Sequence, residues 1–128
     1  MAGYSGTPLP QKLGIKDGAR VRLLGAPGDL AGALGVSPRP RGEADVIVLF
    51  ARTAKDVERL CPRARKSLSM SGGLWVAWPK KASGVATDLS EDAVRRYGLA
   101  QGLVDNKVCA IDDTWSGLRF VVRLADRP

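Results

Sequence analysis

The segment 45–50, Asp-Val-Ile-Val-Leu-Phe, is a nearly continuous apolar run bounded by polar residues. A run this short suits a strand that is covered on both faces, as in a parallel sheet. In the next segment, 53–68, apolar residues recur at spacings of three and four, at Val57, Leu60, Cys61, Ala64 and Leu68. They share one face of a helix. A buried strand followed by an amphipathic helix predicts an α/β sheet.

The other segments extend this alternation. Strands are predicted at 20–24, 74–78, 107–111 and 118–124, with turns at 71–73 and 112–117. Short helices are expected at 11–14 and 29–34, the second with Asp29 as a possible cap. A longer helix runs from Asp88 to Gly102, because Asp88 and Glu91 resemble a capping box.

The predicted fold class is therefore α/β. We expect a compact three-layer, Rossmann-like sheet of about five strands, mostly parallel, with a C-terminal antiparallel hairpin and helices on both faces. The 128 residues suit one domain. We place that domain at 11–128, after an N-terminal arm at 1–10 that contains two prolines and two glycines.

Histidine is absent from the sequence, and this excludes serine–histidine triads, histidine phosphoryl carriers and His-x-x-His zinc sites. The two cysteines, Cys61 and Cys109, cannot form a metal site by themselves, and small buried side chains are their expected role. We assign no catalytic residue, metal or cofactor. Whether the protein is an enzyme stays open, and the missing acid–base groups favour a protein that is not one.

The formal net charge of +7 is concentrated in the first half, where residues 1–70 carry 12 basic and 6 acidic side chains. Such a balance is compatible with nucleic-acid binding, for which Arg63, Arg65 and Lys66 are the candidates, but also with a solvated helix face. No apolar run reaches the length of a signal peptide core or a membrane span. The expected location is cytoplasmic, with no membrane contact.

Two segments are similar to parts of the class I methyltransferase family. Residues 13–25 resemble the approach to its first strand and glycine loop, and residues 68–76 resemble the helix, Gly-Gly and strand before its fifth strand. The resemblance implies a Rossmann-like fold and binding of S-adenosylmethionine. However, the loop 24–28 lacks that family's acidic residue and third glycine, and the ten residues 35–44 are too few for another strand crossover. The chain therefore resembles a truncated version of this fold.

More closely, the whole chain resembles a family of small uncharacterised bacterial proteins, a domain of unknown function. The segments that carry this resemblance are 3–9, 74–84, 102–109 and 115–118. It implies no activity. Loss of two strands would leave strand 20–24 at an edge, where Arg20 and Arg22 would guard against pairing, or where a second copy would pair to form a homodimer.

Ligands in open α/β sheets bind beyond the carboxyl ends of the strands, and four loops converge there on this topology: 25–29, 51–53, 79–86 and 112–116. The candidate ligand-binding residues in these loops are Gly25, Gly28, Lys80, Lys81, Ser83, Asp112, Asp113, Trp115 and Ser116. The lysines and Ser83 suit an anion, the aspartates a ribose or a divalent cation, and Trp115 a flat ligand. Each also has a structural interpretation, as a solvated lysine pair, turn caps and a core tryptophan.

The function expected from these residues is a non-catalytic Rossmann-like module that binds a small anionic ligand or a protein partner at the strand ends. A reduced S-adenosylmethionine-dependent methyltransferase is the first alternative. The second is a nucleic-acid-binding protein that uses its basic N-terminal half.

Overall fold

A computed structural model describes residues 8–28 and 30–127 of the chain. Five strands in these ranges form one sheet in the order β1-β2-β3-β5-β4. They are β1 (Val21–Leu24), β2 (Ala44–Phe50), β3 (Leu68–Pro79), β4 (Leu103–Ala110) and β5 (Trp115–Val122). β2 pairs in parallel with β1 and β3, whereas β5 pairs antiparallel with β3 and β4. Two of the four pairings are parallel, so the mostly parallel sheet predicted from the sequence is confirmed only in part.

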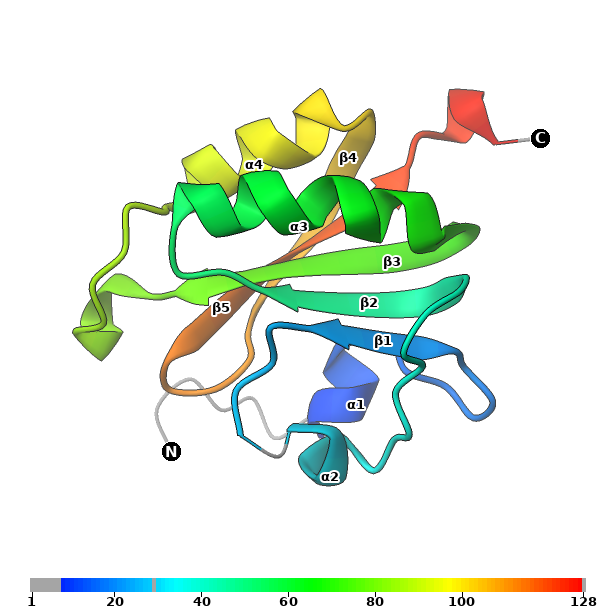
Figure 1. The fold of residues 1–128 in the computed structure, drawn as a ribbon, viewed down its shortest axis with the longest axis horizontal. Helices are drawn as coiled ribbons and strands as arrows, with labels where there is room; N and C mark the ends of the chain where they lie inside the picture. Colours follow the sequence, from blue (N-terminus) through cyan, green and yellow to red (C-terminus); the bar gives the residue numbers. More distant parts are fainter. Residues whose placement is uncertain (1–7, 29, 128) are drawn as a thin grey trace.

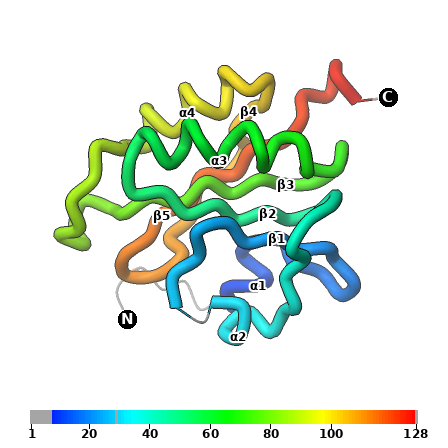
Figure 2. Tube along the Cα trace, viewed as in Figure 1, coloured from blue at the N-terminus to red at the C-terminus, as the bar shows by residue number. Residues whose placement is uncertain are grey.

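Helices cover both faces of this sheet. One face carries α3 (Ala54–Ser67) and α4 (Glu91–Ala100), and the other carries the shorter α1 (Leu9–Lys12) and α2 (Leu30–Leu34), as Figures 1 and 2 show. Two 3-10 turns, Lys81–Ser83 and Leu124–Asp126, complete the described elements. The three-layer α/β architecture is confirmed. Among the described residues, no helix is long and apolar enough to cross a membrane.

The core lies in two layers, one on each side of the sheet, because successive residues of a strand point to opposite faces. Trp78 packs in the layer under α3 and α4, and Trp75 in the layer under α1 and α2. The indole of Trp75 is fully buried and donates a hydrogen bond to the carbonyl of Leu13, 3.0 Å away. That bond ties the segment after α1 to the centre of the sheet.

The expected turn at residues 71–73 is wrong, because these residues continue β3. The glycines there allow close packing: a Cβ on Gly72 would lie 2.7 Å from the carbonyl oxygen of Asp45 on the neighbouring strand. The last two strands are also displaced from the predicted ranges, to Leu103–Ala110 and Trp115–Val122. The glycines inside β3 and the polar residues along the edge strand β4 made the ends of these strands hard to predict from the sequence.

The capping box predicted at Asp88 is wrong as well. Ser90 caps α4, with its hydroxyl oxygen 3.2 Å from the backbone nitrogen of Ala93. The carboxylate of Asp88 instead accepts a hydrogen bond from the backbone N–H of Ala54 at 2.8 Å, and so caps α3 from a distant loop. Local spacing predicted that Asp88 caps α4, but in the structure a tertiary contact uses it to cap α3.

β1 lies at an edge of the sheet, as expected, but Arg22 and Arg20, the residue just before β1, do not act together as guards. Arg22 is buried, and its guanidinium donates to the hydroxyl of Ser67 at the end of α3. Arg20 pairs with the carboxylates of Asp45 and Glu43. The homodimer through this edge stays a prediction.

Only some of the predictions for the N-terminal part of the chain fall on residues that the structure describes. Most of the arm predicted at 1–10, and the possible cap Asp29, lie outside the described residues. The first helical turn begins at Leu9 instead of at residue 11.

Candidate functional site

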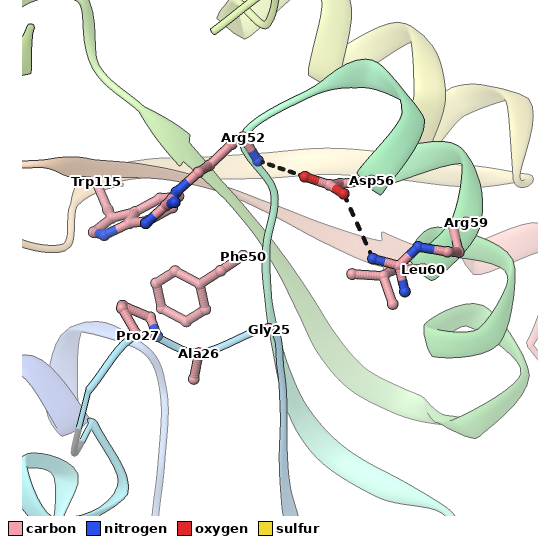
Figure 3. Close-up of a pocket in the computed structure, with 9 residues that line it drawn as sticks. All are labelled: Gly25, Ala26, Pro27, Phe50, Arg52, Asp56, Arg59, Leu60 and Trp115. Atoms are coloured by element: carbon pink, nitrogen blue, oxygen red, sulfur yellow. Dashed lines mark hydrogen bonds and ion pairs between the residues drawn. The ribbon is translucent and has the colours of Figure 1, made fainter. Parts of the chain in front are cut away.

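The carboxyl ends of β1, β2 and β3 and the start of β5 meet at one edge of the sheet, because β5 runs antiparallel to its neighbours. A pocket of about 350 Å³ opens at this edge between the β1–α2 loop, the β2–α3 loop and the first turns of α3. We call it the carboxyl-end pocket (Figure 3). Its lining residues are Gly25, Ala26, Pro27, Phe50, Arg52, Asp56, Arg59, Leu60 and Trp115.

One wall of the carboxyl-end pocket is aromatic. Phe50 and Trp115 meet edge to face, with ring centroids 5.0 Å apart and an interplanar angle of 90°. Both side chains are buried, so each presents only part of its ring to the pocket. The backbone N–H of Trp115 donates to the Oδ1 of Asp112 at 2.8 Å, which fixes the start of β5. This pair gives the pocket a rigid apolar side.

The charged lining residues come from the β2–α3 loop, with Arg52, and from the first turns of α3, with Asp56 and Arg59 (Figure 3). Thr53 and Asp56 form a capping box there. The Oδ2 of Asp56 accepts hydrogen bonds from the backbone N–H groups of Arg52 and Thr53 at 3.1 and 3.3 Å. Its Oδ1 pairs with the guanidinium of Arg59 at 3.5 Å. The N–H of Arg52, chiefly, holds the pKa of Asp56 below its ordinary value, so this carboxylate stays ionised.

Arg52 extends along the pocket toward Trp115 (Figure 3), and its guanidinium pairs with no described residue. The pocket therefore holds two guanidinium groups and a single described carboxylate, whose oxygens are both occupied. At the N-terminus of α3, the carboxylate of Asp88 accepts from the backbone N–H of Ala54 and the hydroxyl of Thr53 from that of Asp56. Arg52 therefore carries the unpaired positive charge of this pocket, and Arg59 adds a second guanidinium that is paired with Asp56.

Gly25 shapes the floor of the pocket. Its φ is +67°, a conformation that other residues rarely adopt, and a Cβ would lie 2.8 Å from the carbonyl oxygen of Phe50. Gly28, the other predicted glycine, has a φ of +53° with open space around it, and it does not line the pocket. Of the residues predicted from the sequence, the structure brings Gly25 and Trp115 together.

The predicted lysine loop lies at the same edge but outside the pocket. Ser83 is engaged in its own turn, where its hydroxyl donates to the carbonyl of Lys80 at 2.6 Å and accepts from the N–H of Val85 at 3.2 Å. The backbone N–H of Lys80 donates to the carbonyl of Thr114. Neither Lys80 nor Lys81 lines the pocket.

The predicted aspartates do not line it either. Asp112 accepts hydrogen bonds from the N–H groups of Thr114 and Trp115, both at 2.8 Å, which is a turn-capping role. Its side chain also borders a separate cavity beside α1 and α2. Asp113 and Ser116 line neither the carboxyl-end pocket nor that cavity. Within the described ranges, no three histidine, cysteine or carboxylate side chains are grouped as a metal site requires.

The residues that the sequence analysis missed are Arg52, Asp56 and Arg59. A signal was present, because Thr53 and Asp56 have capping-box spacing directly after a buried strand. In a parallel sheet this position faces the ligand edge, and an arginine on either side of the box would then point to it.

The two cysteines are free and offer no nucleophile. Burial raises the pKa of Cys61 to about 11, and burial also raises the pKa of the half-buried Cys109. Both thiols are therefore protonated near neutral pH, and the thiolate is the reactive form.

Comparison with solved structures identifies the fold. The mitomycin 7-O-methyltransferase superimposes with a TM-score of 0.62 at 15% identity, over 91% of this chain and 53% of that one. The ribosomal protein L11 methylase of Lactobacillus delbrueckii subsp. bulgaricus gives a TM-score of 0.53 at 13% identity, over 92% of this chain and 67% of the other. The fold is that of a class I methyltransferase. This agrees with the resemblance noted in the sequence.

The likeness is one of fold alone. The pre-rRNA processing protein fibrillarin from Methanococcus jannaschii, with a TM-score of 0.50 and 14% identity, is covered over 55% of its length, and the chain thus spans about half of two of these three structures. No protein-family model matches the sequence, and no curated protein matches it.

The residues of the carboxyl-end pocket do not fit S-adenosylmethionine. The reactive group of that cofactor is a sulfonium cation, and this pocket presents the unpaired guanidinium of Arg52 together with Arg59. The one lining carboxylate, Asp56, already accepts from the backbone N–H groups of Arg52 and Thr53 and pairs with Arg59. Trp115 packs on Phe50 over the end of β2. The charge of the pocket suits an anion instead.

Proposed function

We propose that this protein is a non-catalytic, methyltransferase-like module that binds a small phosphate-bearing ligand in its carboxyl-end pocket. The observation that carries the proposal is the charge of the pocket, where Arg52 and Arg59 face a space whose one described carboxylate is already hydrogen-bonded. Guanidinium groups bind phosphate through paired, charge-assisted hydrogen bonds. The Phe50–Trp115 wall supplies apolar contact for the rest of the ligand.

Isothermal titration calorimetry with three probes tests this proposal: inorganic pyrophosphate, adenosine 5′-monophosphate and S-adenosylmethionine. The last two share the adenosine group and differ in charge, so the comparison isolates the sign of the preferred charge. We expect the two phosphate compounds to bind and S-adenosylmethionine not to bind. The double variant Arg52→Ala/Arg59→Ala should weaken phosphate binding at least tenfold.

The matched control is Arg63→Ala/Arg96→Ala, which removes the same charge from exposed helix positions outside the pocket. It should change the affinity less than twofold. Equal weakening by both double variants would show non-specific attraction to a basic protein, and the proposal would then be wrong.

A reduced methyltransferase is the second candidate function, and the observation that favours it is the fold shared with the methyltransferases. It predicts that S-adenosylmethionine binds more tightly than adenosine 5′-monophosphate in the same titrations. Nucleic-acid binding through Arg63, Arg65 and Lys66, and a protein partner at the strand ends, stay predictions.

A further inference from the structure

The opposite end of the sheet carries a second pocket, of about 450 Å³, which we call the amino-end pocket. The loop between α1 and β1 forms one wall, and the beginnings of β2 and β3 with the middle of β5 form the other. Its lining residues are Gly14, Lys16, Asp17, Gly18, Ala19, Asp45, Val46, Ser71 and Arg119.

Arg119 is the unusual residue of this pocket, because it is a half-buried cation without a carboxylate partner. Its Nη1 donates to the side-chain oxygen of Asn106 at 3.3 Å, and its other nitrogens donate to no described residue. By contrast, Arg95 pairs with three carboxylates, those of Glu91, Asp92 and Asp105. Arg119 therefore retains hydrogen-bond donors that the protein does not use.

The surroundings of Arg119 add positive charge. Lys107 stands opposite it on β4, and Lys16 lines the same pocket. Burial, and then the charge of Arg127, lower the pKa of Arg119 from its ordinary value. The guanidinium still remains protonated at neutral pH, because an arginine begins from a pKa above 12. A cation in this position is stabilised by an anion.

The two carboxylates that line the pocket do not supply that anion. Asp45 is bound by Arg20, through its guanidinium and its backbone N–H, and by the hydroxyl of Ser69. Asp17 forms no ion pair with a described residue. Neither carboxylate lies within ion-pair distance of Arg119.

Gly73 leaves room for the guanidinium of Arg119. A Cβ on Gly73 would lie 2.4 Å from Nε, 2.6 Å from Nη2 and 2.7 Å from Cζ of Arg119. Cζ is the farthest of these three atoms and Nη1 is not among them, so the Nε–Nη2 side of the guanidinium lies nearest to the glycine and Nη1 points away from it. The φ of Gly73 is not in the left-handed region, so its backbone conformation does not require a glycine. The close approach of the Arg119 side chain is what requires a glycine at position 73.

We propose that the amino-end pocket binds the phosphate group of a small phosphate monoester, through Arg119 with Lys16 as a second cation. A guanidinium packed against the backbone of Gly73, with N–H donors that no described residue uses, suits charge-assisted contact with phosphate oxygens. The volume of the pocket exceeds that of inorganic phosphate, so the rest of the ligand lies along the loop 14–19. The site is independent of the carboxyl-end pocket and shares no residue with it.

The test is an NMR titration of the full chain with glycerol 3-phosphate, followed by backbone amide shifts. We expect saturable shifts at Gly18, Gly73 and Arg119. Arg119→Gln should weaken this binding at least tenfold, whereas Arg96→Gln, which removes the same charge from an exposed site on α4, should weaken it less than twofold. The variants Arg52→Ala/Arg59→Ala should leave it unchanged, which separates this site from the proposed function.

Gly73→Ala is the second variant, because it keeps the charge and displaces the guanidinium. It should lose binding as Arg119→Gln does, with the fold verified by the dispersion of the amide spectrum. Absence of saturable shifts at this end in the wild type would overturn the proposal. Equal weakening by Arg119→Gln and Arg96→Gln would overturn it as well, as would tighter, steeply salt-dependent binding of a single-stranded oligonucleotide at the same residues.

Discussion

The two ends of the sheet both present arginine to a pocket, but a different kind of contact shapes each end. At the carboxyl end, Gly25 is required by its positive φ and by the carbonyl of Phe50, which are both features of the backbone. At the amino end, Gly73 is required only by the side chain of Arg119. Backbone atoms cannot move without disturbing the sheet, whereas an arginine side chain can rotate away. The carboxyl end should therefore be rigid, and the amino end should be adjustable.

The largest expected effect comes from Gly25→Ala. The left-handed conformation costs alanine about 1–2 kcal/mol, and the clash with the Phe50 carbonyl adds about 1–3 kcal/mol, so the free energy of unfolding should fall by about 3 kcal/mol. Gly28→Ala is the control, because Gly28 also has a positive φ but open space around it, and it should lose only about 1 kcal/mol. Urea unfolding measures both. Equal losses would mean that the Phe50 contact does not constrain this end.

Trp75→Phe should affect the amino end selectively. It removes the hydrogen bond to the buried carbonyl of Leu13, and an unsatisfied buried carbonyl costs about 1–3 kcal/mol. The amide hydrogens of residues 14–19 should then exchange faster, since that wall loses its attachment to β3. Trp78→Phe is the matched control on the opposite face, where the indole donates to no described residue. If both variants accelerate exchange there equally, the bond to Leu13 does not hold that wall.

Asp45→Asn should produce a smaller effect that depends on pH. The guanidinium of Arg20, with its backbone N–H, holds the pKa of Asp45 well below the ordinary range. The stabilisation by a carboxylate with a lowered pKa is complete above its unfolded pKa, near 4, and is lost as the pH falls through its folded pKa. The variant should therefore melt at a lower temperature than the wild type at pH 7, and the difference should narrow only below about pH 4.

The control for this measurement is Asp17→Asn, which changes a carboxylate of the same pocket that forms no ion pair with a described residue. The melting temperatures of Asp17→Asn should match those of the wild type at every pH between 2 and 7. A difference between Asp45→Asn and the wild type that stays constant across this range would contradict the assigned role of the charge.

Gly73→Ala should have the smallest effect on stability. Arg119 can rotate away from the new methyl group, so the free energy of unfolding should change by less than about 1 kcal/mol. Urea unfolding of Gly73→Ala and Gly25→Ala under the same conditions compares the two losses of unfolding free energy directly. A loss as large as that of Gly25→Ala would show that Arg119 is held as rigidly as a backbone atom, and that both ends of the sheet are built alike.

The elements that could be predicted from the sequence are those whose own residues determine them. The apolar run of β2, the periodicity of α3 and the opposite facing of Trp75 and Trp78 all follow from local spacing. The carboxyl-end position of a candidate site follows from the order of strands and helices. These features need no knowledge of distant contacts.

The features that could not be predicted depend on contacts between distant segments. Asp88 caps a helix 34 residues earlier, and the glycines at 72 and 73 serve neighbouring strands instead of a turn. Charged residues in loops favoured Lys80 and Asp112 as site residues, although neither residue lines the carboxyl-end pocket. The role of Arg52 follows only from the three-dimensional structure, in which the loop after β2 lies beside Trp115.

The most direct test of the central claim is an NMR titration of the wild-type chain with adenosine 5′-monophosphate and, separately, with S-adenosylmethionine. We expect the monophosphate to shift the amide signals of Gly25 and Arg52 and the indole signal of Trp115, and S-adenosylmethionine to leave them unchanged. Shifts of these three signals by S-adenosylmethionine, with none from the monophosphate, would contradict the central claim.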